Sequence, residues 1–197
     1  MPIPNLMIVI ASTRPGRGGT AVAEWFIDRA RGHGGFELDI ADLVVLQLPF
    51  LDEPNHPRLR QYTQPHTFAW SERVDAADAF VFVFVTPEYN YGYPATLKNA
   101  IDFLHQEWQY KPVGFVAYGG VAAGTRSLQQ LTQVVSALRM TSIGPAVTLP
   151  FFTQFIGEDG AVHANEVMEH SARAVLDELL RVQETLRPLR SPAAAEA

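Results

Sequence analysis

The nine residues that begin at Ser12 combine hydroxyl groups, arginines and glycines in a pattern that suits a phosphate group. Ser12 and Thr13 offer neutral donors, and Arg14 and Arg17 offer guanidinium groups whose planar donors match a phosphate dianion. The stretch lies between a predicted strand and a predicted helix, and unpaired amides at a helix start also attract anions. It lacks the P-loop and GxGxxG patterns, so a nucleoside triphosphate or a Rossmann dinucleotide fits poorly. The alternative is a solvated turn with two surface arginines.

A second stretch, residues 86–102, could contact a planar molecule. It begins with a loop rich in proline, asparagine and tyrosine, and aromatic rings can stack on a flat ligand or line its edge. Backbone amides of such a loop can also bind the carbonyl and imide groups of the ligand. The alternative is a surface turn of the same composition. Lys98 and Asp102 lie four residues apart on the helix that follows, so they can form an ion pair, which we expect to be structural or interfacial rather than catalytic.

A third stretch, residues 119–126, is rich in glycine and again lies between a predicted strand and a predicted helix. An open parallel sheet places its ligand in the crevice at the carboxyl ends of its strands. Three strand-to-helix turns of this kind therefore converge at one edge of the sheet. Together they predict a site in which the first turn binds a phosphate and the other two bind a flat ring.

The elements that must position these turns alternate between strands and helices. Short apolar runs indicate buried strands of a parallel sheet, and the segments between them carry apolar residues at helical spacing. Strands are expected at residues 5–11, 36–40, 79–85, 111–118 and 146–149, and helices at 21–31, 66–78, from about 94, at 128–138 and at 165–186. This alternation predicts an α/β fold with a doubly wound parallel sheet of five strands.

We expect one domain over residues 1–186 and a disordered tail over residues 187–197, which are rich in proline and alanine. Residues 42–65 form a long irregular stretch with several prolines. Because loops of this length are unusual in a compact domain, we expect the stretch to cover a site or an interface.

The composition of the 197-residue chain excludes several classes of protein. It contains no cysteine, which excludes disulfides, thiolate metal sites and dithiol redox chemistry, so any redox activity needs a cofactor. The net charge of −6 argues against broad binding to nucleic acids or anionic membranes. The sequence has no signal-peptide pattern and no apolar run long enough to span a membrane, so we expect a cytoplasmic protein.

Two groups of acidic and histidine residues raise the question of a metal site. Neither has the spacing of a metal motif, and a solvated loop or helix face explains each group better. The groups are Asp52, Glu53 and His56, and His163, Glu166 and His170. We therefore predict no metal site. The sequence also has no nucleophile elbow and no Ser/His/Asp triad, and we assign no catalytic side chain.

The stretch Pro87–Asp102 reads PEYNYGYPATLKNAID, and it resembles the PEYN-x-x-x-P-x-x-LKNAID segment of the NAD(P)H-dependent FMN reductases. Residues 8–20 and 111–126 fit the same family in the same order, so the resemblance covers roughly residues 3–150. It implies a flavodoxin-like fold with the strand order 2-1-3-4-5. Ala11 departs from the family, which often has glycine there, but the change is small.

The resemblance also implies which residues bind FMN. The first loop would hold the phosphate, the second would line the isoalloxazine ring mainly through backbone atoms, and the third would close over the flavin. The residues are Ser12, Thr13, Arg14 and Arg17 in the first loop, Pro87, Glu88, Tyr89 and Asn90 in the second, and Tyr118, Gly119 and Gly120 in the third. For Arg126 two accounts stay open, a contact with the phosphate of NADPH and a surface arginine at a helix start.

We therefore expect an FMN-dependent NAD(P)H oxidoreductase. It would pass a hydride from NAD(P)H through FMN to a small-molecule acceptor such as a quinone, an azo compound, a free flavin or a metal oxyanion. The alternatives are a reductase that supplies free reduced FMN to a partner monooxygenase, a flavodoxin-like electron carrier, and a structural or regulatory protein that has lost its cofactor. The arginines of the first loop count against a flavodoxin, whose hydroxyl-rich phosphate loop lacks them.

The resemblance further implies a homodimer or a tetramer with the flavin near the subunit contact. Trp108, Phe151 and Phe152 are candidates for exposed apolar residues at such an interface. No nucleic-acid or membrane partner is expected.

Overall fold

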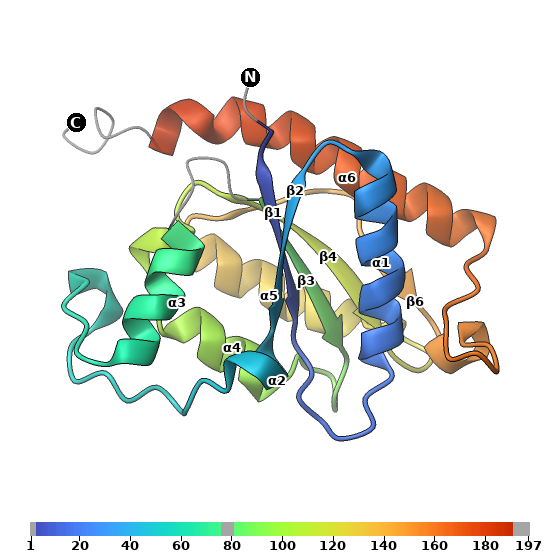
Figure 1. Cartoon of the computed structure of the whole chain (residues 1–197), viewed down its shortest axis with the longest axis horizontal. Helices are drawn as coiled ribbons and strands as arrows, with labels where there is room; N and C mark the ends of the chain where they lie inside the picture. The colour runs from blue at the N-terminus through green and yellow to red at the C-terminus, as the bar shows by residue number, and fades with distance from the viewer. Residues whose placement is uncertain (1–2, 76–80, 191–197) are drawn as a thin grey trace.

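A parallel sheet forms the centre of the computed structural model, which describes residues 3–75 and 81–190. Its strands follow the order β2-β1-β3-β4-β5, and β6 also pairs with β4 (Figure 1). The strands are β1 (Asn5–Ile10), β2 (Glu37–Asp42), β3 (Val81–Pro87), β4 (Pro112–Tyr118), β5 (Thr141–Ser142) and β6 (Val147–Leu149). The order confirms the predicted flavodoxin-like arrangement, and all of these pairings are parallel.

The prediction of five strands is wrong at the last position, where the structure has two short strands instead of one. β5 pairs Thr141 with Pro112, and β6 pairs Val147 with Val116. The chain advances six positions from Thr141 to Val147, whereas the paired strand β4 advances only four, from Pro112 to Val116. The connection between β5 and β6 therefore contains two more residues than the matching part of β4. The interruption contains Pro145, which has no amide to donate to a strand ladder.

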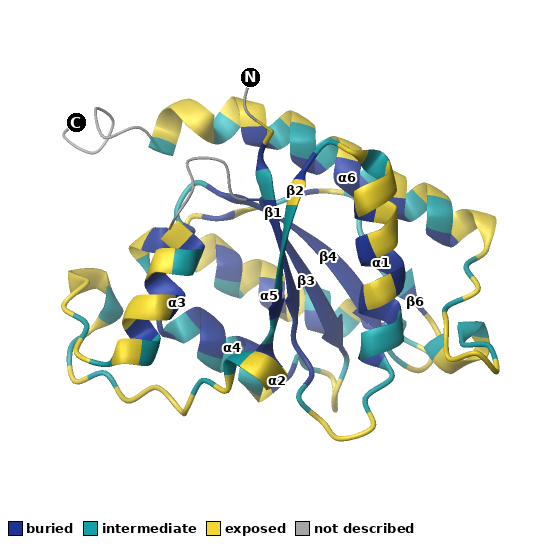
Figure 2. Cartoon of the chain, viewed as in Figure 1, coloured by how far each residue is buried: buried dark blue, intermediate teal, exposed yellow. Residues whose placement is uncertain are grey.

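Helices cover both faces of the sheet, as a doubly wound fold requires (Figure 1). Successive strand residues face opposite layers, so Val83 packs with α1 and α6, whereas Phe82 and Phe84 pack with α3, α4 and α5. The helices are α1 (Gly19–His33), α2 (Leu43–Leu46), α3 (Pro65–Asp75), α4 (Ala95–Asp102), α5 (Thr125–Ala137) and α6 (Glu166–Leu186). Figure 2 shows β3 and β4 buried along their whole length, because both of their faces are covered.

The last long helix matches its prediction closely. Its N-cap is Asn165, whose side chain accepts a hydrogen bond from the amide of Met168 at 3.0 Å. The apolar residues predicted to face inward are all buried: Met168, Ala172, Val175, Leu176 and Leu179.

Several boundaries differ from the predicted ones, and some predictions fall outside the described residues. Residues 42–65 contain α2 and a 3-10 helix, η1 (Pro57–Leu59), rather than irregular chain throughout. The last residues of the helix predicted at 66–78 and the first residues of the strand predicted at 79–85 lie in the undescribed segment 76–80. Short 3-10 helices also occur at η2 (Gln106–Trp108), η3 (Phe152–Phe155) and η4 (Arg187–Arg190). Residues 187–190 thus begin the predicted tail as a 3-10 helix, and residues 191–197 lie outside the described part.

One interface candidate is a core residue. Trp108 is buried against Phe82, and its indole Nε1 donates a hydrogen bond to the carbonyl oxygen of Ile101 at 3.0 Å. The prediction that Trp108 is exposed is therefore wrong, because a large ring with a partner for its N–H is accommodated between α4 and the sheet. Phe151 is exposed, and Phe152 packs edge-on against Tyr118 with a ring-centroid distance of 4.8 Å.

Candidate functional site

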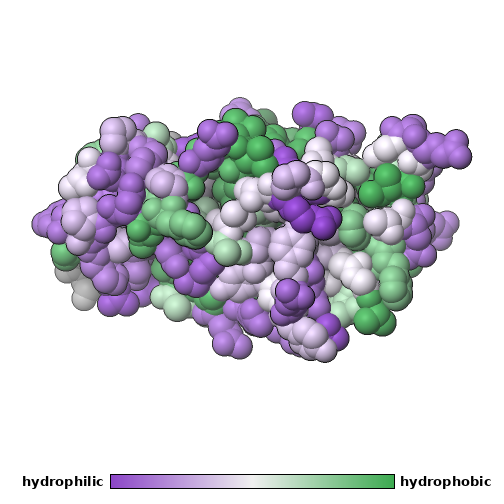
Figure 3. Space-filling model, turned by 90° about the horizontal axis from the view of Figure 1, so that it is seen from below, coloured by the Kyte–Doolittle hydropathy of each residue, from purple (hydrophilic) through white to green (hydrophobic). Residues whose placement is uncertain are grey.

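The three loops predicted to bind a ligand meet at the carboxyl ends of β1, β3 and β4, around a cavity of about 300 Å³. Figure 3 views the molecule from below, toward this end of the sheet, where a largely hydrophilic centre lies between separate hydrophobic patches. The cavity is lined by eight of the eleven predicted residues, namely Arg14, Arg17, Pro87, Glu88, Tyr89, Tyr118, Gly119 and Gly120, together with Gly18, Phe151, Phe152 and Thr153. The other three predicted residues, Ser12, Thr13 and Asn90, do not line it.

Arg17 braces the first loop from within the protein. Its Nη1 donates to Asp42 Oδ1 at 2.8 Å and to the carbonyl oxygen of Ser12, and its Nε donates to Thr20 Oγ1 at 3.1 Å. The hydrogen bond to Asp42 raises the pKa of Arg17. Burial opposes ionisation of Asp42, but the hydrogen bonds from Arg17 and from the amide of Val44 outweigh it and lower the pKa of the carboxyl. Most donors of Arg17 are thus committed to shaping the loop.

Arg14 has the opposite environment. Its side chain is exposed and makes no hydrogen bond or ion pair with any residue in the described ranges 3–75 and 81–190. A guanidinium with free donors at the mouth of a cavity can bind an anion through two parallel hydrogen bonds. Arg14, and not Arg17, is therefore the arginine that is free to reach a phosphate.

The start of α1 supplies a second set of free donors. Its N-cap is Gly18, with no side-chain cap, and its first turn contains no acidic residue. Because the first-turn amides of a helix have no intrahelical acceptor, they point an uncompensated positive end toward the loop. A phosphate group fits these donors, and together with Arg14 they form the kind of anion site that helix starts provide.

Two glycines let aromatic rings lie directly against this helix start. A β-carbon on Gly19 would lie 1.9 Å from the hydroxyl oxygen of Tyr118, and one on Gly18 would lie 2.5 Å from the ring of Phe152. Any side chain at either position would displace a ring. The need for these two glycines comes from residues about 100 and 130 positions later in the chain, so the local sequence gives no sign of it.

Hydroxyl groups connect the first loop with the second. The Oγ of Ser12, which is fully buried, lies 2.7 Å from the hydroxyl of Tyr89. Burial, together with the neighbouring Tyr89, raises the pKa of Tyr118 well above its ordinary value, so Tyr118 is a neutral hydroxyl at neutral pH. Thr13, the next residue of the loop, faces a separate hollow of about 300 Å³ between α2 and α4.

The second loop has its own internal hydrogen bonds. The amide of Glu88 donates to the carbonyl oxygen of Tyr118 at 2.9 Å, and the amide of Tyr89 donates to that of Gly92 at 2.8 Å. Asn90 and Tyr91 have φ angles of 48° and 73°, in the left-handed region, and their amides donate to no described residue. Within this loop the amides without an acceptor are thus those of Asn90 and Tyr91, which directly follow the cavity-lining Tyr89 but do not themselves line the cavity. Tyr91 was not among the predicted residues.

The third loop is joined by backbone hydrogen bonds to the end of β6 and to the residues that follow it. The amide of Gly119 donates to the carbonyl oxygen of Leu149 at 3.2 Å, and the carbonyl oxygen of Gly120 accepts from the amide of Phe151 at 3.2 Å. This pairing brings Phe151, Phe152 and Thr153 to the cavity. The sequence suggested Phe151 and Phe152 only as interface candidates, because nothing local links them to the glycine loop.

The groups that raised the question of a metal do not assemble one. Asp52 pairs with His66 at 2.9 Å, Glu53 accepts the amide of Thr63 at 2.8 Å, and His56 accepts the amide of Arg58. These are three separate contacts, and no cluster of His, Cys, Asp or Glu suited to a metal occurs within residues 3–75 and 81–190.

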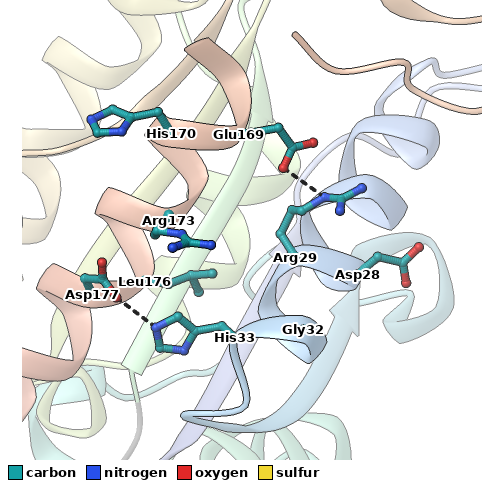
Figure 4. Close-up of a pocket in the computed structure, with 9 residues that line it drawn as sticks. All are labelled: Asp28, Arg29, Gly32, His33, Glu169, His170, Arg173, Leu176 and Asp177. Atoms are coloured by element: carbon teal, nitrogen blue, oxygen red, sulfur yellow. Dashed lines mark hydrogen bonds and ion pairs between the residues drawn. The ribbon is translucent and has the colours of Figure 1, made fainter. Parts of the chain in front are cut away.

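A larger hollow, of about 700 Å³, lies between α1 and α6, away from the three loops (Figure 4). Its charged side chains pair across the two helices, with His33 3.0 Å from Asp177 and Arg29 3.2 Å from Glu169. The hollow is therefore a polar helix–helix groove whose charges largely satisfy one another, and its volume alone does not mark a ligand site.

Comparison with known proteins gives a consistent family assignment. Residues 4–154 match the family model of NADPH-dependent FMN reductases. The chain is 40% identical over 151 residues to an NAD(P)H-dependent FMN reductase of Schizosaccharomyces pombe, covering 75% of this chain and 74% of the relative. It is 32% identical to an NAD(P)H:quinone oxidoreductase of Solanum tuberosum, with 72% and 73% of the two chains covered.

A solved structure agrees at the level of the fold. The flavoenzyme FerB, an NAD(P)H:acceptor oxidoreductase of Paracoccus denitrificans, superimposes with a TM-score of 0.72 at 19% identity, covering 93% of this chain and 98% of FerB. The family match extends over the three loops, whose free donors fit a phosphorylated ligand. The chain thus belongs to the NADPH-dependent FMN reductase family, as an oxidoreductase that uses FMN as its cofactor and NAD(P)H as its electron donor.

Proposed function

We propose that the cavity at the carboxyl ends of the strands is the FMN site. The phosphate would lie at the start of α1, and the isoalloxazine ring would lie beside the loops at residues 87–92 and 118–120. The observation that carries this proposal is the set of donors without acceptors, namely the first-turn amides of α1 and the exposed guanidinium of Arg14. Such donors are costly to leave unpaired if a ligand covers them without accepting their hydrogen bonds.

Each loop then has a distinct role. Arg14 and the first-turn amides of α1 would bind the phosphate, Ser12 would join the first loop to Tyr89, and Arg17 would hold the loop in shape through Asp42. Pro87, Glu88, Tyr89 and Asn90 would border the ring, with Tyr118, Gly119 and Gly120 beside them.

Hydride transfer requires proximity and orientation more than a titrating side chain. When bound, FMN supplies the redox chemistry, since it takes up hydride from NAD(P)H and gives the electrons to an acceptor. The chain's part is to fix the position of the ring and to present fixed amide dipoles to it. The carboxylate of Glu88 is already paired with Arg126 at 2.8 Å, which leaves it no role as a general base. We therefore assign no catalytic acid or base.

We propose a quinone as the acceptor class. Besides Arg14, which we assign to the phosphate, and Arg17, which is paired with Asp42, the cavity is lined mainly by aromatic rings and glycine backbone, namely Tyr89, Tyr118, Gly119, Gly120, Phe151 and Phe152. Aromatic and backbone surfaces suit a neutral planar acceptor better than a metal oxyanion. The potato relative named as a quinone oxidoreductase supports this choice.

Two measurements test the proposal. The visible spectrum of the purified protein is recorded without oxygen, before and after NADPH. We expect flavin bands that disappear on addition of NADPH, and absence of bands even after added FMN would overturn the site. Rates with a quinone, an azo dye and chromate then rank the acceptors, and a higher kcat/KM for chromate than for the quinone would contradict the acceptor class.

A second candidate role is the supply of free reduced FMN to a partner monooxygenase. The exposure of Arg14 and of the adjacent loop residues Pro15 and Gly16 favours ready exchange of the cofactor. Gel filtration of the FMN-loaded protein separates the two roles. FMN that remains with the protein supports the bound-flavin oxidoreductase, and FMN that is lost in one passage supports the supply role.

We further propose a homodimer, on the basis of an exposed apolar patch next to the hollow between α2 and α4. Val45 is 78% exposed, Phe50 is 85% exposed and Leu51 is 42% exposed, all within residues 45–51. Apolar side chains gathered in this way mark an interaction surface. Light scattering of the wild type and of Phe50→Asp tests the dimer, with dissociation expected for the variant. No helix within the described residues is long and apolar enough to cross a membrane, and a cytoplasmic location stays a prediction.

A further inference from the structure

The loop at residues 89–92 has an unusual conformation for its sequence. Tyr89 and Gly92 exchange two backbone hydrogen bonds, of 2.8 and 3.0 Å, around a two-residue turn. Both central residues, Asn90 and Tyr91, adopt the left-handed conformation. Turns of this kind prefer asparagine and glycine, so a tyrosine in the second position is strained and must be held by its surroundings.

The first two turns of α5 provide that support. The guanidinium of Arg126 stacks on the ring of Tyr91, with Cζ 3.9 Å from the ring centroid. One turn further along the helix, Gln130 Nε2 donates to the carbonyl oxygen of Tyr91 at 3.0 Å. Two contacts from one helix face thus hold the side chain and the backbone of the same strained residue.

The same helix start also holds the beginning of the loop. Arg126 Nη1 donates to Glu88 Oε1 at 2.8 Å, and its amide donates to Glu88 Oε2 at 3.2 Å, so the carboxylate caps α5. Ser127 Oγ donates to the carbonyl oxygen of Pro87 at 3.0 Å. Arg126 therefore connects the helix, the carboxylate and the strained tyrosine.

We propose that Arg126, assisted by Gln130, is the positioning residue that fixes the loop at residues 87–92 for the flavin ring, both its cavity-lining residues Pro87–Tyr89 and the free amides of Asn90 and Tyr91 that follow them. This inference rests on the proposed FMN site. Arg126 does not line the cavity, so it acts through the loop and is not a catalytic residue. Of the two accounts left open by the sequence, a surface arginine and a contact with NADPH, neither includes this role.

A fixed pair of amides has two measurable effects. Because the loop need not be ordered when FMN binds, affinity for FMN rises. Because amide donors interact more strongly with a ring that gains electrons, the reduced cofactor is favoured and the reduction potential rises. Loss of the contacts that Arg126 and Gln130 make with the loop should weaken FMN binding and lower the reduction potential together. A general loss of stability does not predict this combination.

The primary experiment compares Arg126→Ala with Arg139→Ala. Arg139 is a matched control, because its Nη1 donates to the hydroxyl of another tyrosine, Tyr110, at 2.9 Å in a part of the molecule away from the three loops. FMN dissociation constants are measured by quenching of flavin fluorescence, and reduction potentials by equilibration with a reference dye. We expect Arg126→Ala to bind FMN about tenfold more weakly. We also expect its reduction potential to fall by about 30 mV, which corresponds to a tenfold loss in preference for reduced FMN. Arg139→Ala should change neither quantity.

A background substitution isolates the role of strain. In Tyr91→Gly the left-handed position suits the residue, so the loop no longer needs the arginine. Adding Arg126→Ala to this background should weaken FMN binding no more than about threefold. If the full tenfold effect persists, Arg126 acts by another route and the proposal is overturned.

Two further variants protect the test against misfolding. Gln130→Ala removes only the hydrogen bond to the carbonyl oxygen of Tyr91, and we expect a smaller change of the same sign in both affinity and potential. Arg126→Lys keeps the positive charge but loses the planar group that stacks on Tyr91. We expect its FMN affinity and reduction potential to lie between those of Arg126→Ala and the wild type. If the wild type binds FMN but Arg126→Ala has unchanged FMN affinity and reduction potential, the positioning role of Arg126 is overturned and the proposed FMN site is not. Failure of the wild type to bind FMN would overturn both the proposed FMN site and the positioning role of Arg126.

Discussion

Two polar clusters of this protein differ in how completely their groups are paired. The carboxylate of Glu107 is fully buried, and its Oε1 accepts from the hydroxyl of Tyr62 at 2.7 Å and from Ser71 Oγ at 2.6 Å. Its Oε2 accepts from the amide of His105 at 3.2 Å. At the start of α1, in contrast, the first-turn amides and the side chain of Arg14 have no acceptor among the described residues.

The contrast separates a structural cluster from a binding cluster. A buried charge without partners is strongly destabilising, so the cluster around Glu107 must be complete for the chain to fold. The donors at α1 face a cavity, where water satisfies them until a ligand does. A complete cluster should therefore affect stability and leave FMN affinity unchanged, and an incomplete one should do the reverse.

The largest effect is expected for Glu107→Leu. The substitution leaves the hydroxyls of Tyr62 and Ser71 without their buried acceptor, and it should lower the free energy of unfolding by about 3–4 kcal/mol. Urea denaturation measures this change. The control is Glu184→Leu, an exposed carboxylate on α6, for which we expect a change within about 0.5 kcal/mol. A loss of FMN affinity in folded Glu107→Leu would break the distinction between the clusters.

A pH-dependent effect of nearly the same size is expected for Lys111, which is buried close to the Glu107 cluster. Its Nζ donates to the carbonyl oxygen of Val74 at 2.7 Å, and burial lowers the pKa of Lys111 from 10.5 to about 8. Below pH 8 both the folded and the unfolded lysine are protonated, so the full cost of the buried charge is present. Between pH 8 and 10.5 only the unfolded lysine keeps its proton, so this cost is progressively removed and stability rises.

Comparison of the wild type with Lys111→Met isolates this contribution from the titration of other groups. From pH 7 to pH 10, the unfolding free energy of the wild type should increase by about 2–3 kcal/mol relative to that of the variant. A constant difference between the two proteins over this range would show that Lys111 does not titrate as its burial indicates.

On the binding side, Arg14→Ala should weaken FMN binding by about 1.5–3 kcal/mol, the usual contribution of a charged hydrogen bond. Its stability should stay the same, because Arg14 has no partner in the described protein to lose. Fluorescence titration with FMN measures the affinity, and Arg31→Ala, at the far end of α1, serves as the control. An unchanged dissociation constant would remove Arg14 from the site.

The smallest effect is expected for Tyr89→Phe. Loss of its hydrogen bond with Ser12 removes a connection between the first two loops, and it should weaken FMN binding by about 0.5–1 kcal/mol. Tyr91→Phe is the matched control, because the hydroxyl of Tyr91 has no hydrogen bond with a described residue. Equal effects of the two variants on the FMN dissociation constant would mean that the Ser12 contact does not contribute.

Much of the fold could be predicted because its signals are local. Alternating apolar runs and amphipathic segments gave the parallel sheet, the helices on both faces and the inner face of α6, and the resemblance supplied the strand order. The split of the last strand into β5 and β6 was missed, since a two-residue bulge changes the register without changing the apolar composition. Trp108 was misjudged because the partner of its indole N–H lies in the preceding helix.

The site was predicted in outline but not in its individual contacts. The sequence pointed to the three loops, yet it could not distinguish Arg14 from Arg17. That distinction depends on Asp42, which lies at the end of a neighbouring strand. Likewise, the free amides belong to Asn90 and Tyr91 because the amides before them are used by Tyr118 and Gly92.

The sequence by itself determined the order of elements, the residue types in each loop and the family, since these follow from patterns along the chain. Only the tertiary structure decided which donors remain free, why Gly18 and Gly19 must lack side chains, and that Arg126 supports Tyr91. The physical reason is that a hydrogen-bond donor is available to a ligand only if no other group claims it. Its competitors come from segments far away in sequence.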